Sequence, residues 1–261
     1  MHARRLLAAL LACAAGLPAA AIDRFEIQVY EAGINEPGHF GLELHSNFTA
    51  RGSRTPAYPG EIPPWHTARF TLEPAVGVTS WLELGAYLQV FDAPAHGFQY
   101  AGSKVRAKLV APKLLGEHFF LGLNIEVGRV VKEVEQDQWA NEFRPFVGWH
   151  DEWLLVDVNP IVGYALSGKD SFRPVFEPAA KVAVNTQLGF AVGAEYYAEL
   201  GFIDDLLPGR QQSHYLFGVV DLVEAHGGPR SEWEINLAVG GGISGPTDQQ
   251  LIVKTIIGRS F

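Results

Sequence analysis

The sequence offers few of the side-chain arrangements that carry enzymatic chemistry. Its nine histidines are scattered and none stands in an H-x-x-x-H pair, so the spacing of a helical metal site is missing. Ser213 and His214 are adjacent, and adjacent side chains of a strand point to opposite faces, so they cannot act directly as nucleophile and base. The glycine-rich stretch VGGGISGP, 239–246, lacks the lysine of a phosphate-binding loop. We therefore expect no enzyme, no cofactor and no bound metal.

Charged side chains instead recur at alternate positions of apolar segments, where they share one face. Isolated charges inside a protein are costly, so this face must meet water or pair its charges. Two arrangements satisfy that requirement: an interior filled by ion pairs, or a polar channel in which the basic ladder Lys104, Arg106 and Lys108 faces acidic walls and orients permeating solutes. The candidate lumen-lining residues are Glu43, Arg69, Glu73, Glu83, Lys104, Arg106, Lys108, Glu126, Glu142, Arg144, Asp157, Glu177, Lys181, Glu195, Glu199, Glu232, Glu234 and Lys254.

Twelve segments with period-two alternation position these charges, each near the roughly 9 to 11 residues of a transmembrane strand. In the first, Phe40, Leu42 and Leu44 share the face opposite Glu43 and His45, and the fourth sets Ala101 with Val105 opposite its basic residues. The tenth, SHYLFGVVDLVEA (213–225), is apolar on both faces, so its sides stay open. Pro145 and Pro160 fall inside predicted strands, where a missing amide donor predicts bulges or shorter strands.

Connection lengths decide between a soluble sandwich and a barrel. The connections after odd-numbered segments are long, such as 50–66 and 202–212, whereas those after even-numbered segments are mostly short, such as 79–80 and 151–152. A Greek-key sandwich gives no reason for this sorting, but an up-and-down barrel with short periplasmic turns and longer external loops does. We predict an all-β fold, a closed antiparallel up-and-down transmembrane β-barrel of about twelve strands.

The first residues predict export. A basic start at Arg4 and Arg5, an apolar core and small residues up to Ala21 form a secretory signal peptide, 1–21, cleaved before Ile22. A lipoprotein cleavage site at Cys13 is the alternative. Removing the two arginines leaves 18 basic against 29 acidic residues, a formal charge of 11 negative, which argues against a nucleic-acid partner. The mature chain divides into an N-terminal segment, 22–38, that is a tail, a seam strand or a plug, and a barrel, 39–261.

The chain ends on LIVKTIIGRSF, with Phe261 on the face of Val253 and Ile257. This end resembles bacterial outer-membrane proteins whose C-terminal phenylalanine is recognised by the barrel-assembly machinery, although Arg259 departs from that pattern. The stretches FEIQVYEAGINEPGHFGLELH and TSWLELGAYL resemble outer-membrane proteins near the phenol meta-pathway transporter family. The resemblance implies location in the cell outer membrane and, as an expectation, hydrophobic or aromatic solutes.

Two functions remain open at this stage. The polar inner face favours a passive channel for small solutes, whereas the balanced inner charges and the proline-rich stretch 54–65 favour a closed structural or surface-binding barrel. The expected partners are the lipid bilayer, lipopolysaccharide and the barrel-assembly machinery. Asp204, Asp205 and Arg210 could bridge lipopolysaccharide through divalent cations or form an ordinary solvated loop.

Overall fold

The structure, a computed structural model, describes residues 23–111, 116–222 and 233–261. The predicted signal peptide with its cleavage before Ile22, the alternative at Cys13 and the candidate residue Glu232 lie outside this part of the chain. Within the described residues, no helix is long and apolar enough to span a membrane.

The described residues form one antiparallel sheet and a single short 3-10 helix, η1 (Gly209–Gln211). The strands are β1 (Phe40–Gly52), β2 (Ala68–Thr79), β3 (Leu82–Ala93), β4 (Gly97–Val110), β5 (Phe119–Val130), β6 (Trp139–His150), β7 (Leu154–Asn159), β8 (Val162–Ala165), β9 (Val175–Phe176), β10 (Ala179–Asn185), β11 (Phe190–Glu199), β12 (Gly201–Phe202), β13 (Asp205–Leu206), β14 (Ser213–Leu222), β15 (Trp233–Gly242) and β16 (Gln249–Ser260).

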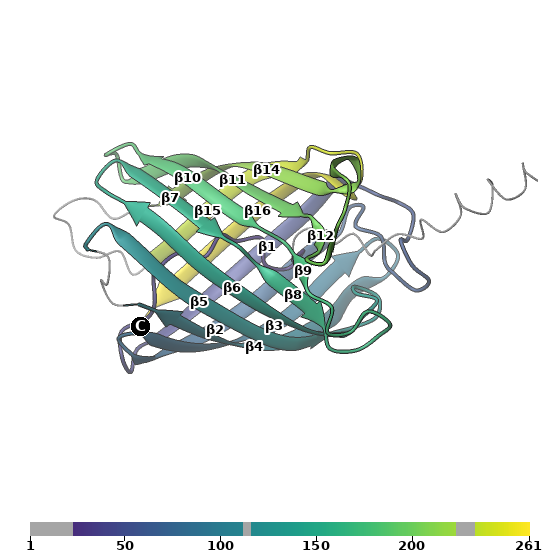
Figure 1. Ribbon diagram of the computed structural model, residues 1–261, viewed down its shortest axis with the longest axis horizontal. Helices are drawn as coiled ribbons and strands as arrows, with labels where there is room; N and C mark the ends of the chain where they lie inside the picture. The colour runs from purple at the N-terminus through teal and green to yellow at the C-terminus, as the bar shows by residue number, and fades with distance from the viewer. Residues whose placement is uncertain (1–22, 112–115, 223–232) are drawn as a thin grey trace, which may run out of the picture.

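The sheet closes on itself. From β1 to β6 and from β14 to β16 each strand pairs with its sequence neighbours, β1 pairs with β16, and the additional pairing of β6 with β7 closes the ring. Several wall strands are interrupted, so that β7 with β8, β9 with β10 and β11 with β12 each cross the wall once. Counted in this way, the described residues form a twelve-stranded up-and-down barrel (Figure 1), which confirms the predicted fold class.

The two faces of the wall differ as the alternation predicts. Leu42 and Leu44 of β1 are 41% and 40% exposed on the outside of the barrel. His45, in the same strand between β2 and β16, is fully buried on the inside. One outward prediction is wrong: Ala101 is buried within the barrel. Gln89 pairs with Gly102 and Val90 pairs with Tyr100, so Ala101 is the extra residue of a β-bulge in β4. The bulge turns the side chain of Ala101 toward the interior. The result is a barrel with an apolar outer belt and a polar interior.

Both prolines mark the same interruption of the wall. β6 pairs with β8 through 140–143 and with β7 through 147–150, which leaves Pro145 without a partner on that side. Pro160 separates β7 from β8 directly opposite. Because neither proline has an amide hydrogen to donate, the ladder between β6 and β7–β8 is interrupted here, and β7 is short as predicted, whereas β6 continues through Pro145.

Candidate functional site

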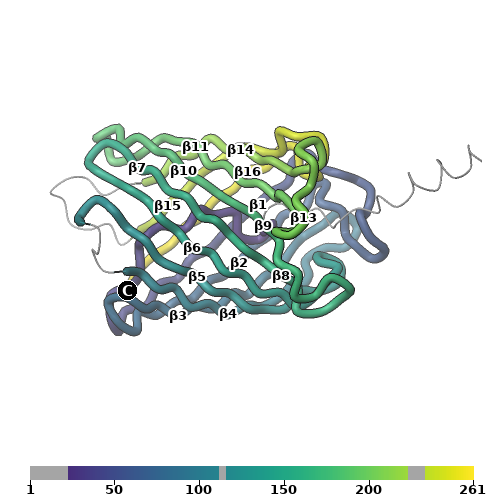
Figure 2. Tube along the Cα trace, viewed as in Figure 1, coloured from purple at the N-terminus to yellow at the C-terminus, as the bar shows by residue number. Residues whose placement is uncertain are grey.

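The N-terminal segment, Asp23–Gly38, runs through the interior of the barrel. At its start Arg24 donates from Nη1 to Glu61 Oε1 at 3.1 Å and from Nη2 to Asp248 Oδ2 at 2.5 Å, and both acids stand in long connections. At its end Asn35 Nδ2 donates to Glu83 Oε2 at 2.7 Å, next to a short turn. Figure 2 shows this purple segment between the walls. The segment thus contacts side chains of the barrel at both of its ends.

Before Pro37, which bridges Gly77 of β2, wall side chains and not strand pairing hold the segment in place. Three basic wall residues donate to main-chain carbonyl oxygens of the segment: Lys254 Nζ to Ile27 at 2.7 Å, Arg144 Nη1 to Gln28 at 2.9 Å and Lys108 Nζ to Gly33 at 2.6 Å. Hydrogen bonds from charged donors are among the stronger ones in proteins. The inward-facing bases of the sequence are therefore in part the anchors of an internal peptide.

Asn159 adds a clamp at the break in the wall. Its Oδ1 accepts from the amide of Tyr30 at 2.7 Å, and its Nδ2 donates to the carbonyl of the same residue at 3.1 Å. Asn159 is fully buried and immediately precedes Pro160, so its amide group serves the segment at the point where the wall ladder stops. Asn159 was not among the residues predicted from the sequence. An inward-facing asparagine directly before a proline that interrupts a strand could have indicated its role.

Apolar side chains of the segment complete the packing. Ile27 and Val29 belong to a buried cluster with Tyr215, Phe217 and Val219 of β14. These contacts settle the two-sided apolar character of the tenth predicted strand: Tyr215, Phe217 and Val219 face the segment, and Leu216 and Val220 face outward. Phe25 packs in a second cluster and Tyr30 in a third, with Phe120 and Phe146.

The candidate lumen residues lie on the inner face wherever the structure describes them. The register sets Glu43 opposite Glu73, Glu83 opposite Lys108, Arg106 opposite Glu126, Glu126 opposite Glu142, Asp157 opposite Lys181, and Lys181 opposite Glu195. Arg69, Arg144, Glu199 and Lys254 are buried inside, Lys104 pairs with Glu126, Glu177 lies beside Gly163, and Glu234 borders an inner cavity with Glu43.

Most of these charges form ion pairs with one another. Arg106 bridges Glu73 at 2.5 Å and Glu83 at 2.8 Å, and Lys254 Nζ lies 2.5 Å from Glu195 Oε2. The expected basic ladder of β4 is thus divided among different partners, because Lys104 pairs with Asp23 and Glu126 while Lys108 binds the segment. Pairing removes much of the penalty of burying single charges.

One inner group has the side chains of a metal site. One ligand atom each of Glu43, His45 and Glu73 lies within 4.8 Å of the others. His45 Nε2 is 3.0 Å from Glu73 Oε2 and 3.5 Å from Glu43 Oε2, and Arg106 Nε takes the second oxygen of Glu73. The group is thus a set of ion pairs between bases and carboxylates, while the buried Nδ1 of His45 has no hydrogen-bond partner among the described residues.

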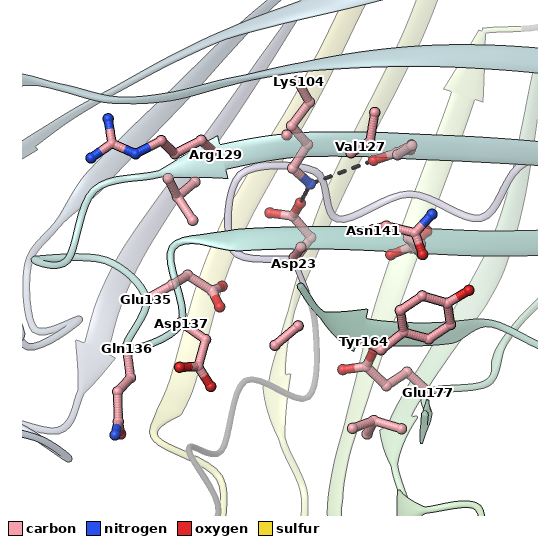
Figure 3. A pocket seen from close by; sticks show the side chains of 18 of the residues that line it. Asp23, Lys104, Val127, Arg129, Glu135, Gln136, Asp137, Asn141, Tyr164 and Glu177 are labelled. Atoms are coloured by element: carbon pink, nitrogen blue, oxygen red, sulfur yellow. Dashed lines mark hydrogen bonds and ion pairs between the residues drawn. The ribbon is translucent and has the colours of Figure 1, made fainter. Parts of the chain in front are cut away.

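Cavities lie at both ends of the segment. The first, about 220 Å³, opens at the end with long connections and is bordered by Asp23, Lys104, Glu135 and Glu177, which Figure 3 labels. The second, about 240 Å³, lies at the opposite end beside Asn35 and Glu234. The segment therefore lies between two cavities.

Glu135, in the connection between β5 and β6, supplies a pH-dependent contribution to stability. Burial and the negative charge of Asp23 raise the pKa of this half-buried carboxyl to about 7, and the charge of Arg24 opposes the rise. Since the raised pKa favours the protonated form in the folded protein, the contribution is full below the ordinary pKa of a glutamate and is lost as pH rises through about 7.

We expect Glu135→Gln to remove this dependence. Between pH 5 and pH 8 the unfolding free energy of the wild type should fall relative to that of the variant, by at most about 3 kcal/mol, because one pKa unit corresponds to about 1.4 kcal/mol. Urea unfolding in detergent micelles at both pH values measures the difference. Parallel pH profiles of the two proteins would contradict the assignment to Glu135.

Comparison with known proteins finds similarity in structure and not in sequence. No family model and no curated protein sequence matches the chain. An outer membrane channel from Pseudomonas putida F1 superposes with a TM-score of 0.60 at 11% identity, covering 90% of this chain and all of that one. The NanC porin gives 0.55 at 10% identity over 84% of this chain and 98% of that one, and the KdgM porin 0.53 at 11% over 85% and 99%. The chain shares the β-barrel fold of these outer-membrane proteins.

Proposed function

We propose that the protein is a passive channel for small solutes in the cell outer membrane, and that residues 23–38 close its lumen in the state described here. The observation that carries this proposal is the manner in which the segment is held. Side chains of the wall bind its main chain. The first residue of the segment that pairs with a strand is Pro37, which bridges Gly77. The part of the segment before Pro37 can therefore leave the lumen without breaking any strand pairing. The inner wall left behind has many polar and charged side chains beside apolar ones such as Phe217, and its charged groups suit a water-filled pore.

The outer surface supports the location. Apolar side chains on the outer face of nearly every wall strand are exposed, among them Leu88, Val105, Val147, Val182 and Val239. Such a belt suits acyl chains and not water. The superposed proteins are described as an outer membrane channel and as porins. The resemblance to the phenol meta-pathway family adds hydrophobic or aromatic solutes as the solute class, and contact with lipopolysaccharide through Asp204 and Asp205 stays part of the same proposal.

The second candidate is a closed barrel with a structural or surface-binding role. The density of ion pairs inside the barrel favours it, because Arg106, Lys254 and Lys181 each have acidic partners within 3.0 Å. A lumen that is permanently filled in this way would conduct nothing. Neither candidate includes enzymatic activity, and its absence stays a prediction.

Planar-bilayer recording distinguishes the two candidates. The folded full-length chain and a variant lacking residues 23–34 are each inserted into bilayers, after heat-dependent gel mobility has verified the barrel. A channel predicts ion conductance from the shortened variant and transitions between closed and open states from the full chain. No conductance from either folded protein would reject the channel in favour of the closed barrel.

Phe261 supports a separate prediction on assembly. Its amide donates to the carbonyl of Phe40 at 2.8 Å, which joins the chain end to the first strand, and its side chain is 63% exposed on the outside. If the terminal residue is a signal for the assembly machinery, deleting Phe261 should lower the amount of folded barrel in cells several-fold. Refolding of the purified variant into detergent should change little. An equal loss in both settings would show that the residue acts only through stability.

A further inference from the structure

We propose that the cavity at the end with long connections binds a small organic cation with an apolar body, that is, a primary ammonium compound, as the preferred solute. This inference names the solute class and rests on the proposed channel function for its physiological meaning. The binding site itself is argued from the geometry of the cavity.

Carboxylates dominate the polar surface of the cavity. Its lining includes Asp23, Glu126, Glu135, Asp137, Glu142, Asp170, Glu177 and Glu199, against the bases Lys104, Arg129 and Arg173. Lys104 forms ion pairs with Asp23 and Glu126, and Arg173 forms ion pairs with Asp204 and Asp205. Among the described residues, no lysine or arginine forms an ion pair with Glu135, Glu177 or Glu199. The cavity therefore contains acidic side chains that have no basic partner in the described ranges, and a bound cation would supply that partner.

Glu199 has a buried carboxylate oxygen that no described residue binds. Its side chain lines the cavity at the end of β11 but is only 5% exposed, and its Oε2 has no hydrogen-bond partner in the described part of the protein. A buried carboxylate oxygen without a donor is costly. Glu177 comes to the same place from the neighbouring strand, because the amides of Ala198 and Leu200 bond to the carbonyls of Pro178 and Phe176. An ammonium group has three donors for these oxygens.

The remainder of the lining is apolar and aromatic. Phe25, Val130, Tyr164 and Phe202 border the cavity. The guanidinium carbon of Arg173 already lies 3.7 Å from the ring centroid of Phe202, so that ring accepts a cation over its face. With about 220 Å³, the cavity is smaller than the roughly 300 to 1,000 Å³ typical of drug-sized ligands, which limits the solute to a small molecule.

The spacing of the carboxylates indicates that the cavity binds an organic cation and not a metal ion. Chelation requires several oxygens at roughly 2.0 to 2.6 Å from one centre. In the described residues, only Glu43, His45 and Glu73, outside this cavity, bring three ligand atoms within 4.8 Å of one another. The cavity carboxylates are thus too dispersed to enclose one ion, but they suit an extended molecule with one charged end.

Isothermal titration of the full chain in detergent tests the inference with 2-phenylethylammonium as the probe. Phenylacetate and benzyl alcohol, of similar size but negative and neutral, serve as matched ligands and require no variant. We expect saturable binding of the ammonium compound and at least roughly tenfold weaker binding of the other two, which corresponds to about 1.4 kcal/mol. Equal binding of all three, or binding of Ca²⁺ without binding of the ammonium compound, would overturn the proposal.

Variants then locate the site. Glu177→Gln/Glu199→Gln should weaken binding of the ammonium compound at least tenfold, whereas Glu133→Gln should not, because Glu133 is an exposed acid of the same region that does not border the cavity. Unchanged binding by the folded double variant would overturn the assignment. A barrel that conducts but shows no ammonium binding refutes this inference alone, and one that binds without conducting refutes the channel alone.

Discussion

Deletion of residues 23–34 is expected to raise the time-averaged ion conductance of the barrel roughly tenfold or more, a shift of at least about 1.4 kcal/mol in the balance of closed and open states. The deleted residues include Phe25, Ile27, Val29 and Tyr30, whose side chains fill the lumen between the two cavities. They contribute no strand of the barrel. The wall should therefore remain while water enters the vacated interior.

Adding back a synthetic peptide of residues 23–34 provides the matched control for this experiment. The peptide carries the carbonyl groups of Ile27, Gln28 and Gly33 that the wall binds, so it should lower the conductance of the shortened barrel. A peptide of the same composition in scrambled order should have less effect, because the apolar side chains then miss their pockets. Equal conductance of the full and shortened chains would contradict the assignment of the segment as the block.

Lys254→Met is expected to lower the unfolding free energy by about 3 to 5 kcal/mol, because it removes one partner of a buried ion pair. Lys254 is fully buried between Glu195 Oε2, at 2.5 Å, and the carbonyl of Ile27, at 2.7 Å. Without the ammonium group, Glu195 keeps Tyr197, whose hydroxyl donates at 2.7 Å, as its remaining close donor. Urea unfolding followed by tryptophan fluorescence measures the loss.

A second substitution distinguishes the stability lost with the ion pair from the stability lost with side-chain packing. Lys254→Met/Glu195→Gln should recover part of the stability, since no charge is then left alone in the interior. Arg173→Gln is the control with a less buried ion pair: Arg173 is half-buried, Asp204 is exposed, and their pair at 3.1 Å should contribute no more than about 1 kcal/mol. A Lys254→Met variant within 1 kcal/mol of the wild type would show that water already solvates this position.

Much of the barrel could be predicted from the sequence, because its wall obeys a period of two. The alternation of Leu42, Glu43 and Leu44 assigns both faces of β1, and an apolar face that must meet lipid leaves the polar face for the interior. Bulges or shorter strands were predicted at Pro145 and Pro160, and the two prolines lie across one gap in the ladder, with β7 ending before Pro160 and β6 continuing through Pro145. Both results follow from local chemistry of the chain.

The path of the N-terminal segment could not be predicted, because its partners are distant in sequence. The stretch EIQVY alternates like a strand, but in the barrel its main chain is bound by Lys254, Arg144 and Asn159 from three separate strands. The apolar inner face of β14 was ambiguous for the same reason, since Ile27 and Val29 cover it. The inward turn of Ala101 depends on a bulge whose position no residue type marks.

The central claim is that a closed wall with apolar side chains outside surrounds an internal peptide, and nitroxide accessibility in liposomes tests it most directly. Cysteines for labelling are introduced singly at positions 28, 42 and 43; the chain's one native cysteine, Cys13, lies within the predicted signal peptide. We predict that the label at 42 is accessible to lipid-soluble oxygen and the label at 43 is not, while the label at 28 is immobilised and shielded from oxygen and aqueous nickel reagent. A mobile label at 28, open to the aqueous reagent, or reversed accessibility at 42 and 43, would contradict the account.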